Sequence, residues 1–466
     1  MHMKIMDHII TATATVLSAV AIAPACVAEK PDVLFIAVDD LNDWVGCLDG
    51  HPQSKTPNID RLANSGMLFT RAYCSAPACR PSRTAVVTGR RPSTTGVYSN
   101  GDNNAGIDLV NDRGSGPAMK EVLILPHFLK ENGYTLAGCG KIHGGIRWDE
   151  FFKRPKDPRV IPGKDKDAMM TQPGGPLDVA DEEMGDYQIT NWALKQMSIK
   201  RERPLFLAVG YVKPHLPYSV PRRYFDQYPL DAIQLPETIE NDLADVPKAG
   251  IAFYNPEKHR RTVEADEWKR GVQAYLATVA FVDAQIGRLI EGLKQRSSKR
   301  DLIIVLWSDH GYHLGEKEHW AKFALWDDTT RVPLMFSAPG VSKPGSRCDR
   351  PVDLLSLYPT LADLCGLPLP DGLDGPSLKP LLANPQAEWD HVAMTTWGRG
   401  NHGVRDDHFR YIRYANGSEE LYDHRKDPHE WNNLAANPEL AKVKARLARS
   451  LPKTEWSTSP AEGGSK

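Results

Sequence analysis

The sequence predicts an α/β fold, in which a large, mainly parallel sheet is flanked by helices and followed by a smaller α+β subdomain with an antiparallel sheet. Short, nearly continuous apolar runs alternate with amphipathic helical patterns, which is typical of strands buried on both faces of a parallel sheet. After about residue 385 the pattern changes to short strands joined by turns. With 466 residues, the chain is long enough for both units.

The first 28 residues resemble a secretory signal peptide. Lys4 precedes an apolar stretch, Ile9 to Ala23, and small residues follow up to Ala28. Because that stretch is short for a membrane span, we expect no transmembrane span and an exported chain, periplasmic or secreted. Lipoprotein anchoring at Cys26 is the alternative, which Pro24 disfavours. The predicted domains are therefore residues 1–28 as signal peptide, 29–385 as catalytic domain and 386–466 as C-terminal subdomain.

Four apolar runs end abruptly in polar residues: DVLFIAVDD, YTLAGCGKIHGG, PLFLAVGYVKPH and DLIIVLWSDHG. The carboxyl ends of parallel strands meet at one edge of a sheet, where ligands bind, so we expect these polar residues to converge there. The residues in question are Asp39, Asp40, Lys141, His143, Lys213, His215, Asp309 and His310.

Helices are predicted by the apolar stripe from Gly271 to Arg296 and by the segments NIDRLANSGM and ILPHFLKENGY. A further helix is expected after Pro81, over Ser82 to Val87. In the subdomain, ANGS indicates a hairpin, and a helix is expected from about Pro438 to Leu451 with a loose tail after it. We expect residues 150–185 to form a long surface insertion.

The composition argues against some classes of partner and metal site. The net charge is −2 with both signs interspersed, so we expect no nucleic-acid partner. Of the seven cysteines, six remain after removal of the signal peptide, and none forms a C-x-x-C pair that would indicate zinc. In an exported protein these six cysteines could form disulfides, and the sequence leaves that question open. A disulfide at Cys79 is the structural alternative to a chemical role for that residue.

Taken singly, the polar strand ends are ordinary turn formers and solvated side chains. Three carboxylates that converge in a cleft repel one another, so they indicate a divalent cation. The residues concerned are Asp39, Asp40 and Asp309, with the imidazole of His310 beside them. Near them, His143 and His215 are able to move protons at neutral pH. A positive cluster suited to a tetrahedral anion completes the set: Arg83, Lys141, Lys213 and Lys322. With Cys79, this pattern predicts a hydrolase of phosphate or sulfate esters.

The segment Cys79-Arg80-Pro81-Ser82-Arg83, followed by Thr88-Gly89-Arg90, resembles the C-x-P-S-R…T-G-R signature of the type I sulfatases. GKIHGG, VDD and SDHG resemble further segments of that family, and the likeness runs from about residue 30 to 433. VDDLND, GYVKPHLP and SDHGYHLGEKEHWAK are most similar to the iduronate-2-sulfatase branch. The resemblance implies an alkaline-phosphatase-like sandwich.

The resemblance also implies a mechanism. A maturation enzyme that reads Pro81 and Arg83 converts Cys79 to formylglycine, whose hydrated aldehyde attacks sulfur. His215 is then the general acid, and His143 assists the release of sulfate. The sulfate is held by Arg83, Lys141 and Lys322. Lys213 is a further candidate for sulfate contact, and the alternative is that its side chain faces solvent.

The implied metal ligands are Asp39, Asp40, Cys79 as formylglycine, Asp309 and His310. Calcium is the expected cation because the carboxylates are hard ligands. Since His310 stands where many sulfatases have asparagine, magnesium and manganese stay open.

The resemblance points to a sulfated saccharide as substrate, such as a 2-O-sulfated uronic acid of a glycosaminoglycan or algal polysaccharide. Trp397, Asn401, His402 and Arg405 are interpreted either as a sugar-facing patch or as ordinary surface of a small sheet. Two other functions stay open. One is a phosphatase or phosphonate monoester hydrolase of the same superfamily, and the other is a non-catalytic binder of sulfated glycans.

Overall fold

The structure is a computed structural model that describes residues 29–101, 122–158, 174–253 and 256–456. The predicted signal peptide, with Cys26, lies outside the described residues, and so does part of the predicted insertion at 150–185. No helix in the described part of the chain is both long enough and apolar enough to cross a membrane. The six cysteines in this part are all unpaired, so no disulfide forms there, Cys79 included.

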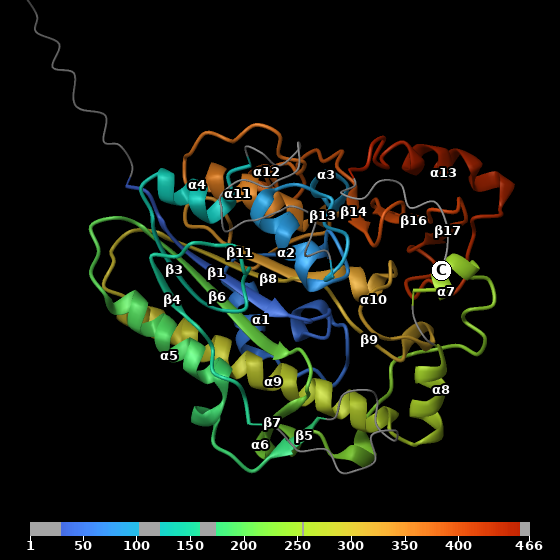
Figure 1. The fold of residues 1–466 in the computed structure, drawn as a ribbon, viewed down its shortest axis with the longest axis horizontal. Coiled ribbons are helices and arrows are strands. Elements are labelled where there is room, and N and C mark those ends of the chain that lie inside the picture. The colour runs from blue at the N-terminus through green and yellow to red at the C-terminus, as the bar shows by residue number, and fades with distance from the viewer. Residues whose placement is uncertain (1–28, 102–121, 159–173, 254–255, 457–466) are drawn as a thin grey trace, which may run out of the picture.

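The centre of the molecule is a large sheet whose strands run in the order β12-β2-β11-β8-β1-β6-β3-β4, with β13 also paired to β2 (Figure 1). Only β11 runs antiparallel to its neighbours, which confirms the predicted mixed, mainly parallel sheet. The strands are β1 (Asp32–Asp39), β2 (Met67–Tyr73), β3 (Thr135–Gly140), β4 (Glu150–Phe152), β6 (Leu205–Pro214), β8 (Leu302–Ser308), β11 (Arg331–Ser337), β12 (Ser346–Cys348) and β13 (Val352–Asp353).

The four predicted apolar runs form β8, β1, β6 and β3, which lie next to one another in the sheet. Val38 of β1 pairs with Ser308 of β8 on one side and with Tyr211 of β6 on the other. Because the strands are parallel and in register, the residues after each strand emerge at the same edge.

Helices cover both faces of the sheet (Figure 1). Leu34, Ile36 and Val38 pack in one core cluster, and the alternate residues of β1 pack in the other, because successive side chains of a strand point to opposite faces. The first cluster includes residues of α1 (Pro57–Asn64), α5 (Gly185–Ser198), α6 (Arg222–Phe225) and α9 (Trp268–Gly292). The second includes residues of α2 (Cys79–Thr88), α4 (Leu125–Glu131), α11 (Leu357–Leu364) and α12 (Lys379–Ala383).

Smaller elements connect these layers. They are α3 (Pro92–Thr95), β5 (Gly175–Leu177), β7 (Ser219–Pro221), α7 (Lys248–Ile251), α8 (Pro256–Glu264), β9 (His313–Leu314), β10 (Trp320–Ala321) and α10 (Asp327–Thr330).

The C-terminal part contains a four-stranded antiparallel sheet and α13 (Ala441–Ala448). The ANGS turn joins the last two strands as predicted, and α13 packs on the sheet through Leu447. The strands are β14 (Ala393–Thr396), β15 (His402–Arg405), β16 (Phe409–Arg413) and β17 (Glu419–Asp423). The exact position of the domain boundary, at residue 385, stays a prediction.

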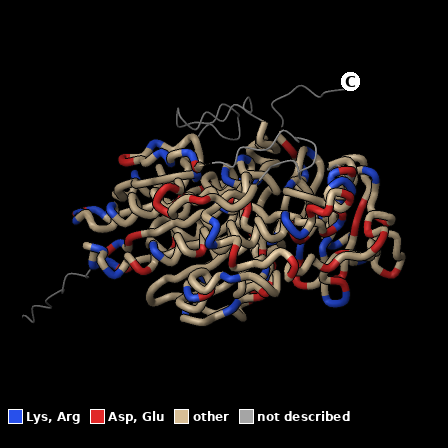
Figure 2. Tube along the Cα trace, turned by 90° about the horizontal axis from the view of Figure 1, so that it is seen from below, with Lys and Arg blue, Asp and Glu red and all other residues tan. Residues whose placement is uncertain are grey.

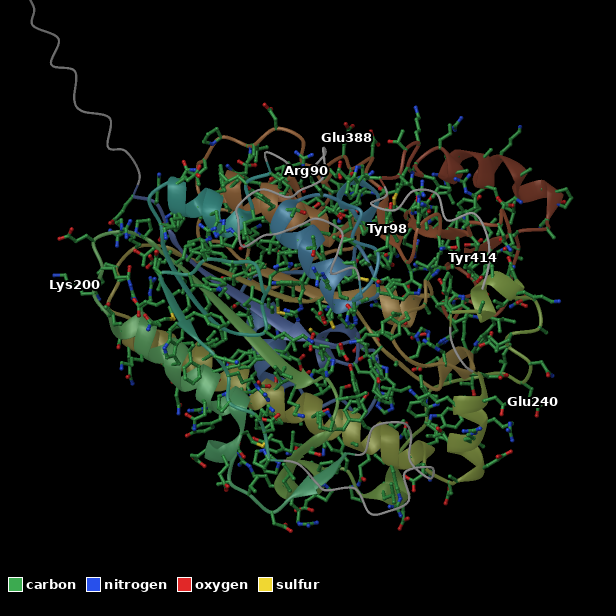
Figure 3. All side chains as sticks on the ribbon, in the orientation of Figure 1. Arg90, Tyr98, Lys200, Glu240, Glu388 and Tyr414 are labelled. Carbon is green, nitrogen blue, oxygen red and sulfur yellow. The ribbon has the colours of Figure 1, made fainter. Side chains whose placement is uncertain are left out.

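The prediction of a loose tail is wrong for residues 452–456. The Trp456 N–H donates to the Ser93 carbonyl at 2.8 Å, and the Tyr98 hydroxyl, labelled in Figure 3, donates to the Trp456 carbonyl at 2.9 Å. Gly96 has φ of 74°, and a Cβ there would meet the Trp456 ring at 2.1 Å, so glycine permits this contact. The tail therefore docks against the segment that follows α3.

Charged side chains of both signs are interspersed along the chain (Figure 2). Within the described residues, one group of buried charged side chains lies at the carboxyl edge of the large sheet.

Candidate active site

The residues of the site come from three elements. Asp39 is the last residue of β1 and Asp40 follows it, Asp309 and His310 directly follow β8, and Cys79 is the first residue of α2. All are buried, and Cys79 keeps a relative exposure of 9%. The alignment of parallel strand ends therefore produces the convergence that the sequence predicted.

Three buried carboxylates face three cationic side chains. Arg83 Nη2 lies 2.9 Å from Asp39 Oδ1, and Arg83 Nε lies 2.8 Å from Asp309 Oδ2. Lys141 Nζ also contacts Asp39, and Lys322 Nζ lies 2.8 Å from Asp40 Oδ1. Burial alone would raise the pKa of Asp39, but Lys141 and Arg83 hold it well below its usual range.

Cys79 Sγ lies at the centre of these groups. It is 3.1 Å from Lys322 Nζ, 3.5 Å from Lys141 Nζ and 3.4 Å from His310 Nε2. Burial, Asp39 and Asp309 raise the pKa of the thiol, but His310, His215 and the adjacent ammonium groups of Lys141 and Lys322 lower it, and the result is a pKa of about 7. Cys74, buried with no such imidazole pair, has a raised pKa instead. Cys79 therefore has the surroundings of a reactive position.

His310 presents the nitrogen that suits a metal. Its Nδ1 lies 3.0 Å from the Gly311 carbonyl and donates to it, which leaves the Nε2 lone pair directed at Asp40 Oδ1, 3.3 Å away. Burial lowers the pKa of His310, but Asp309 and Asp40 raise it to about 9.

The donor set fits a divalent cation. The ligand atoms of Asp39, Asp40, Cys79 and His215 lie within 4.8 Å of one another, and so do those of Cys79, Asp309 and His310. Asp40 Oδ2 is buried and has no hydrogen-bond partner among the described residues. A buried carboxylate oxygen is costly without a partner, and a cation would supply one.

The backbone around Asp40 is held in place by its neighbours. Asp40 has φ of 60°, and its N–H donates to Asp309 Oδ1 at 3.1 Å. Its carbonyl accepts from the Tyr275 hydroxyl of α9 at 2.9 Å. The left-handed conformation, which aspartate tolerates better than most residues, turns the carboxylate toward Cys79 instead of along the strand.

Lys322 is positioned by a loop with an unusual backbone. Ala321 and Phe323, on either side of it, have φ of 85° and 84°. The Lys322 carbonyl accepts from His319 Nε2 at 2.9 Å. Two left-handed, non-glycine residues cost about 1–2 kcal/mol each, so the surrounding contacts determine this conformation.

Two further histidines reach the same space. His215 Nδ1 donates to the Leu216 carbonyl at 2.8 Å, so its Nε2 points toward Asp40 Oδ2, 3.9 Å away. Burial lowers the pKa of His215, but Asp40, Cys79 and Asp39 together raise it above its ordinary value, which favours the protonated ring. His143 accepts the Gly145 N–H at Nδ1, and its Nε2 lies 3.1 Å from Thr84 Oγ1. Burial, with Arg80 and Arg83, lowers the pKa of His143 to about 3 and keeps it neutral.

These side chains line a cavity of about 840 Å³. Six of the predicted residues form part of its wall: Cys79, Arg83, Lys141, His143, His215 and Lys322. The structure thus brings the predicted catalytic residues together around one cavity.

Arg83 is placed differently from its expected role. Its N–H groups donate to Asp39 and Asp309 and to the carbonyls of Lys141 and Ile142. At 3% exposure, it anchors the two aspartates and the strand end of β3 more than it reaches into the cavity. Its main contribution is therefore to hold the carboxylates in position.

Lys213 does not reach the cavity. It is fully buried, and its Nζ contacts the Pro217 carbonyl and lies 3.6 Å from Asp157 Oδ2. In β6 it points to the same face as Tyr211, which packs toward α5 and α9. Both expectations for Lys213, sulfate contact and solvent exposure, are therefore wrong.

The predicted sugar-facing patch does not line the cavity either. His402 lies 2.6 Å from Glu455 through Nε2, and Arg405 is 3% exposed within β15. Asn401 Oδ1 accepts from the Ala415 N–H. Trp397 stacks on Phe323, the residue after Lys322, with ring centroids 5.0 Å apart. Neither interpretation fits His402 and Arg405, because the small sheet is covered on both faces.

The cavity also contains residues that the sequence reasoning missed: Arg80, Thr84, Asn100 and Phe151. Arg80 and Thr84 could have been found from their spacing to Arg83, since residues i, i+3 and i+4 share a helix face. Asn100 and Phe151 carry no such signal, because they reach the cavity through loop and edge-strand geometry.

Comparison with known proteins identifies the family of this chain. The sulfatase family model matches residues 31–367, and a model described as N-sulphoglucosamine sulphohydrolase, C-terminal, matches residues 315–456. A protein named sulfatase from Formosa agariphila is 40% identical over 447 residues, covering 91% of this chain and 87% of that protein. Human iduronate 2-sulfatase is 32% identical over 401 residues, covering 74% and 71%.

Solved structures share the fold. One described as a 2-O GAG sulfatase superimposes with a TM-score of 0.71 at 23% identity, covering 90% of this chain and 91% of the other. The phosphonate monoester hydrolase of Agrobacterium radiobacter gives 0.71 at 24% identity, covering 90% and 94%. These neighbours confirm the alkaline-phosphatase-like architecture. Since the family model spans well over half of the chain and is joined by the 40% identical relative, the protein belongs to the sulfatase family and is a sulfatase enzyme.

Proposed function

We propose that the protein hydrolyses sulfate esters of a carbohydrate through a formylglycine made from Cys79 and a bound calcium ion. The observation that carries the proposal is the surroundings of Cys79 Sγ. Lys322 Nζ and Lys141 Nζ lie 3.1 Å and 3.5 Å from it, and both lysines also contact buried aspartates. This position combines a reactive residue, an anion clamp and a cation site at the wall of one cavity.

Asp39, Asp40, Asp309 and His310 would hold the cation, with the residue at position 79 completing the set. Bound there, calcium would polarise a sulfate oxygen and make a coordinated hydroxyl more acidic. The carboxylates favour calcium, while the imidazole of His310 leaves magnesium and manganese as alternatives. Formylglycine would supply a hydrated aldehyde whose hydroxyl is the nucleophile.

The protein's own side chains then perform three tasks. Lys141 and Lys322 have their ammonium groups next to position 79 and would bind the sulfate oxygens as negative charge develops. His215, whose pKa is raised by Asp40, would donate a proton to the departing sugar oxygen. His143 is neutral and would assist the step that releases sulfate as a hydrogen-bonding group. Arg83 would keep Asp39 and Asp309 in place throughout.

The substrate we propose is a 2-O-sulfated uronic acid of a glycosaminoglycan or algal polysaccharide. Its support is the similarity to a relative named iduronate 2-sulfatase, together with a cavity of about 840 Å³, which is far larger than a sulfate ion. We also propose that the protein is exported to the periplasm or the medium. A formylglycine-generating enzyme would convert Cys79.

A phosphonate monoester hydrolase is the alternative that a specific observation favours, because such an enzyme shares the fold. A cation with an anion clamp serves phosphorus esters as well as sulfate esters. Rates on paired aryl sulfate and aryl phosphonate esters separate the two, since our proposal requires the sulfate to react faster. A non-catalytic glycan binder would be supported by binding without turnover in fully matured protein.

The experiment that tests the proposal is the mass of the tryptic peptide Ala72–Arg83, AYCSAPACRPSR, from the native host. Pro81 shields Arg80 from trypsin, so Cys74 travels in the same peptide as an internal thiol control. We expect Cys79 to carry the aldehyde while Cys74 is alkylated. If both are alkylated even after co-expression with a formylglycine-generating enzyme, the formylglycine mechanism is wrong.

A further inference from the structure

We propose that Asn100, together with Glu455 and Trp456 of the C-terminal tail, positions the first turn of α2 and with it the residue at position 79. The nucleophile of the proposed function stands in that turn, so this inference rests on the proposed function. Asn100 and the two tail residues would be positioning residues: they fix where the nucleophile lies relative to the groups around it.

The helix α2 begins without a cap of its own. Cys79 is its first residue, and Ala78 before it has a methyl side chain, which cannot accept a hydrogen bond. The first N–H groups of a helix have no partner within the helix, and a capping side chain usually accepts from the second or third residue. The third residue, Pro81, has no N–H, so the N–H of Arg80 is the donor that a cap would bind.

Asn100 supplies the missing acceptor. Its Oδ1 accepts the backbone N–H of Arg80 at 2.9 Å, which is the hydrogen bond that an asparagine at the N-cap itself would make. Asn100 also lines the active-site cavity. The cap lies one residue from Cys79, whose Sγ is 3.1 Å from Lys322 Nζ, so a shift of the first turn would change this distance.

The segment that leads to Asn100 is held by the tail. The Trp456 N–H donates to the Ser93 carbonyl at 2.8 Å, and the Tyr98 hydroxyl donates to the Trp456 carbonyl at 2.9 Å. Between these two contacts the Trp456 ring packs on Gly96, where a Cβ would meet it at 2.1 Å. Because two residues span at most about 7 Å, Asn100 stays close to its place while Tyr98 is held.

The tail is anchored in turn on the small antiparallel sheet. Glu455 Oε1 lies 2.6 Å from His402 Nε2, and Glu455 Oε2 accepts the Gly400 N–H at 2.8 Å. His402 is the first residue of β15 and is buried, and its Nδ1 lies 2.9 Å from Thr396 Oγ1 of β14. The tail therefore connects the C-terminal sheet to the segment that carries the cap of α2.

The first test compares the wild type with Asn100→Ala and Asn100→Asp on 4-nitrophenyl sulfate and on a 2-O-sulfated hexuronic acid. We expect Asn100→Ala to lower kcat about threefold to thirtyfold on both esters and to change KM less than about twofold, because losing an N-cap shifts a helix equilibrium by such a factor. Asn100→Asp should restore kcat, since aspartate caps equally well, while its charge raises KM for these anionic esters.

The second test asks whether the tail acts through the same cap. Trp456→Ala should lower kcat in the same way but by less than Asn100→Ala does. The double variant should lose no more than Asn100→Ala alone, because two changes that remove one interaction are not additive. Glu455→Ala releases the tail at its other anchor and replaces Trp456→Ala if that variant does not fold.

Two controls accompany these variants. Lys453→Ala changes an exposed residue of the same tail and should leave kcat unchanged. Each rate is expressed per aldehyde, which is measured in the peptide Ala72–Arg83, and none of the substitutions alters that peptide.

The outcomes separate this inference from the proposed function. A loss confined to KM on the hexuronic acid would show that Asn100 contacts the sugar, and losses that multiply in the double variant would show that the tail acts elsewhere. Either result, or an unchanged kcat in Asn100→Ala, overturns the inference while the sulfatase proposal stands. If matured wild type releases no sulfate from either ester, the proposed function itself is wrong.

Discussion

The proposed role of Asp40 as a metal ligand can be tested separately from its contact with Lys322. We predict that Asp40→Asn folds normally but loses both calcium-dependent stabilisation and activity. Asparagine tolerates the φ of 60° at this position, so the backbone need not change. The substitution keeps one oxygen but removes the charge that faces His310 Nε2 at 3.3 Å and Lys322 Nζ at 2.8 Å.

The expected size of the effect follows from binding linkage. Calcium at a hundredfold excess over its Kd stabilises the folded state by about 2.7 kcal/mol. With an unfolding entropy of about 2.1 cal/mol/K per residue, a chain of 466 residues should gain about 3 °C in Tm. If losing a charged ligand weakens binding about a hundredfold, the gain falls to about 0.4 kcal/mol, or less than about 1 °C.

The assay measures Tm with and without calcium, and sulfate release at matched formylglycine content. We expect the rate to fall at least about a hundredfold, because metal polarisation of the sulfate is worth several kcal/mol. Asp49→Asn is the matched control, since Asp49 also has a positive φ, of 56°, and is exposed. A variant that stays inactive but keeps the full calcium-dependent shift would refute the ligand role, and would assign Asp40 to positioning Lys322.

Three other perturbations test separate parts of the structure. Cys79→Ala should abolish sulfate release with an unchanged unfolding transition, and full activity in that variant would exclude the mechanism. Trp456→Ala should cost about 1–2 kcal/mol in denaturant unfolding, because the half-buried ring packs on Gly96, whereas the exposed control Lys453→Ala should cost nothing measurable.

Arg410→Met should destabilise by about 3–5 kcal/mol at pH 7, because it leaves the partly buried Asp327 and the buried Glu430 without their shared partner. Burial raises the pKa of both carboxyls, but the neighbouring cations, Arg410 first among them, lower it by more, so both pKa values lie below their ordinary range and the stabilisation is present at neutral pH. The deficit of the variant should therefore shrink only as the pH falls below about 4, the ordinary carboxyl range, and a deficit that stays constant there would contradict the ion-pair explanation.

The strand ends were predictable because a buried parallel strand leaves a strong pattern in sequence. DVLFIAVDD and DLIIVLWSDHG each change from wholly apolar to wholly polar within one residue, and β1 and β8 end within a residue of that change. Helices were predictable for the same reason, as the stripe of α9 shows. Both signals are local and need no knowledge of the tertiary structure.

Contacts between distant segments could not be read in this way. Glu455 lies in a stretch with no periodicity, yet it contacts His402, and Trp456 docks near α3. His402 and Arg405 look like surface residues because a four-stranded antiparallel sheet usually leaves one face to solvent. Here Tyr422 packs with Trp326 on one face and Leu421 packs in the cluster that contains α13 residues on the other, so both faces are covered.

The two arginines of the C-R-P-S-R motif illustrate what spacing alone cannot assign. Arg83 is buried and gives its N–H groups to two aspartates and two carbonyls, so its charge is already matched within the protein. Arg80 stands one turn earlier on the same helix face and also lines the cavity, so spacing alone does not separate the roles of the two arginines. Because a charge that the protein neutralises contributes little to ligand binding, Arg83 acts mainly by holding the carboxylates in position, although it is the arginine that defines the motif.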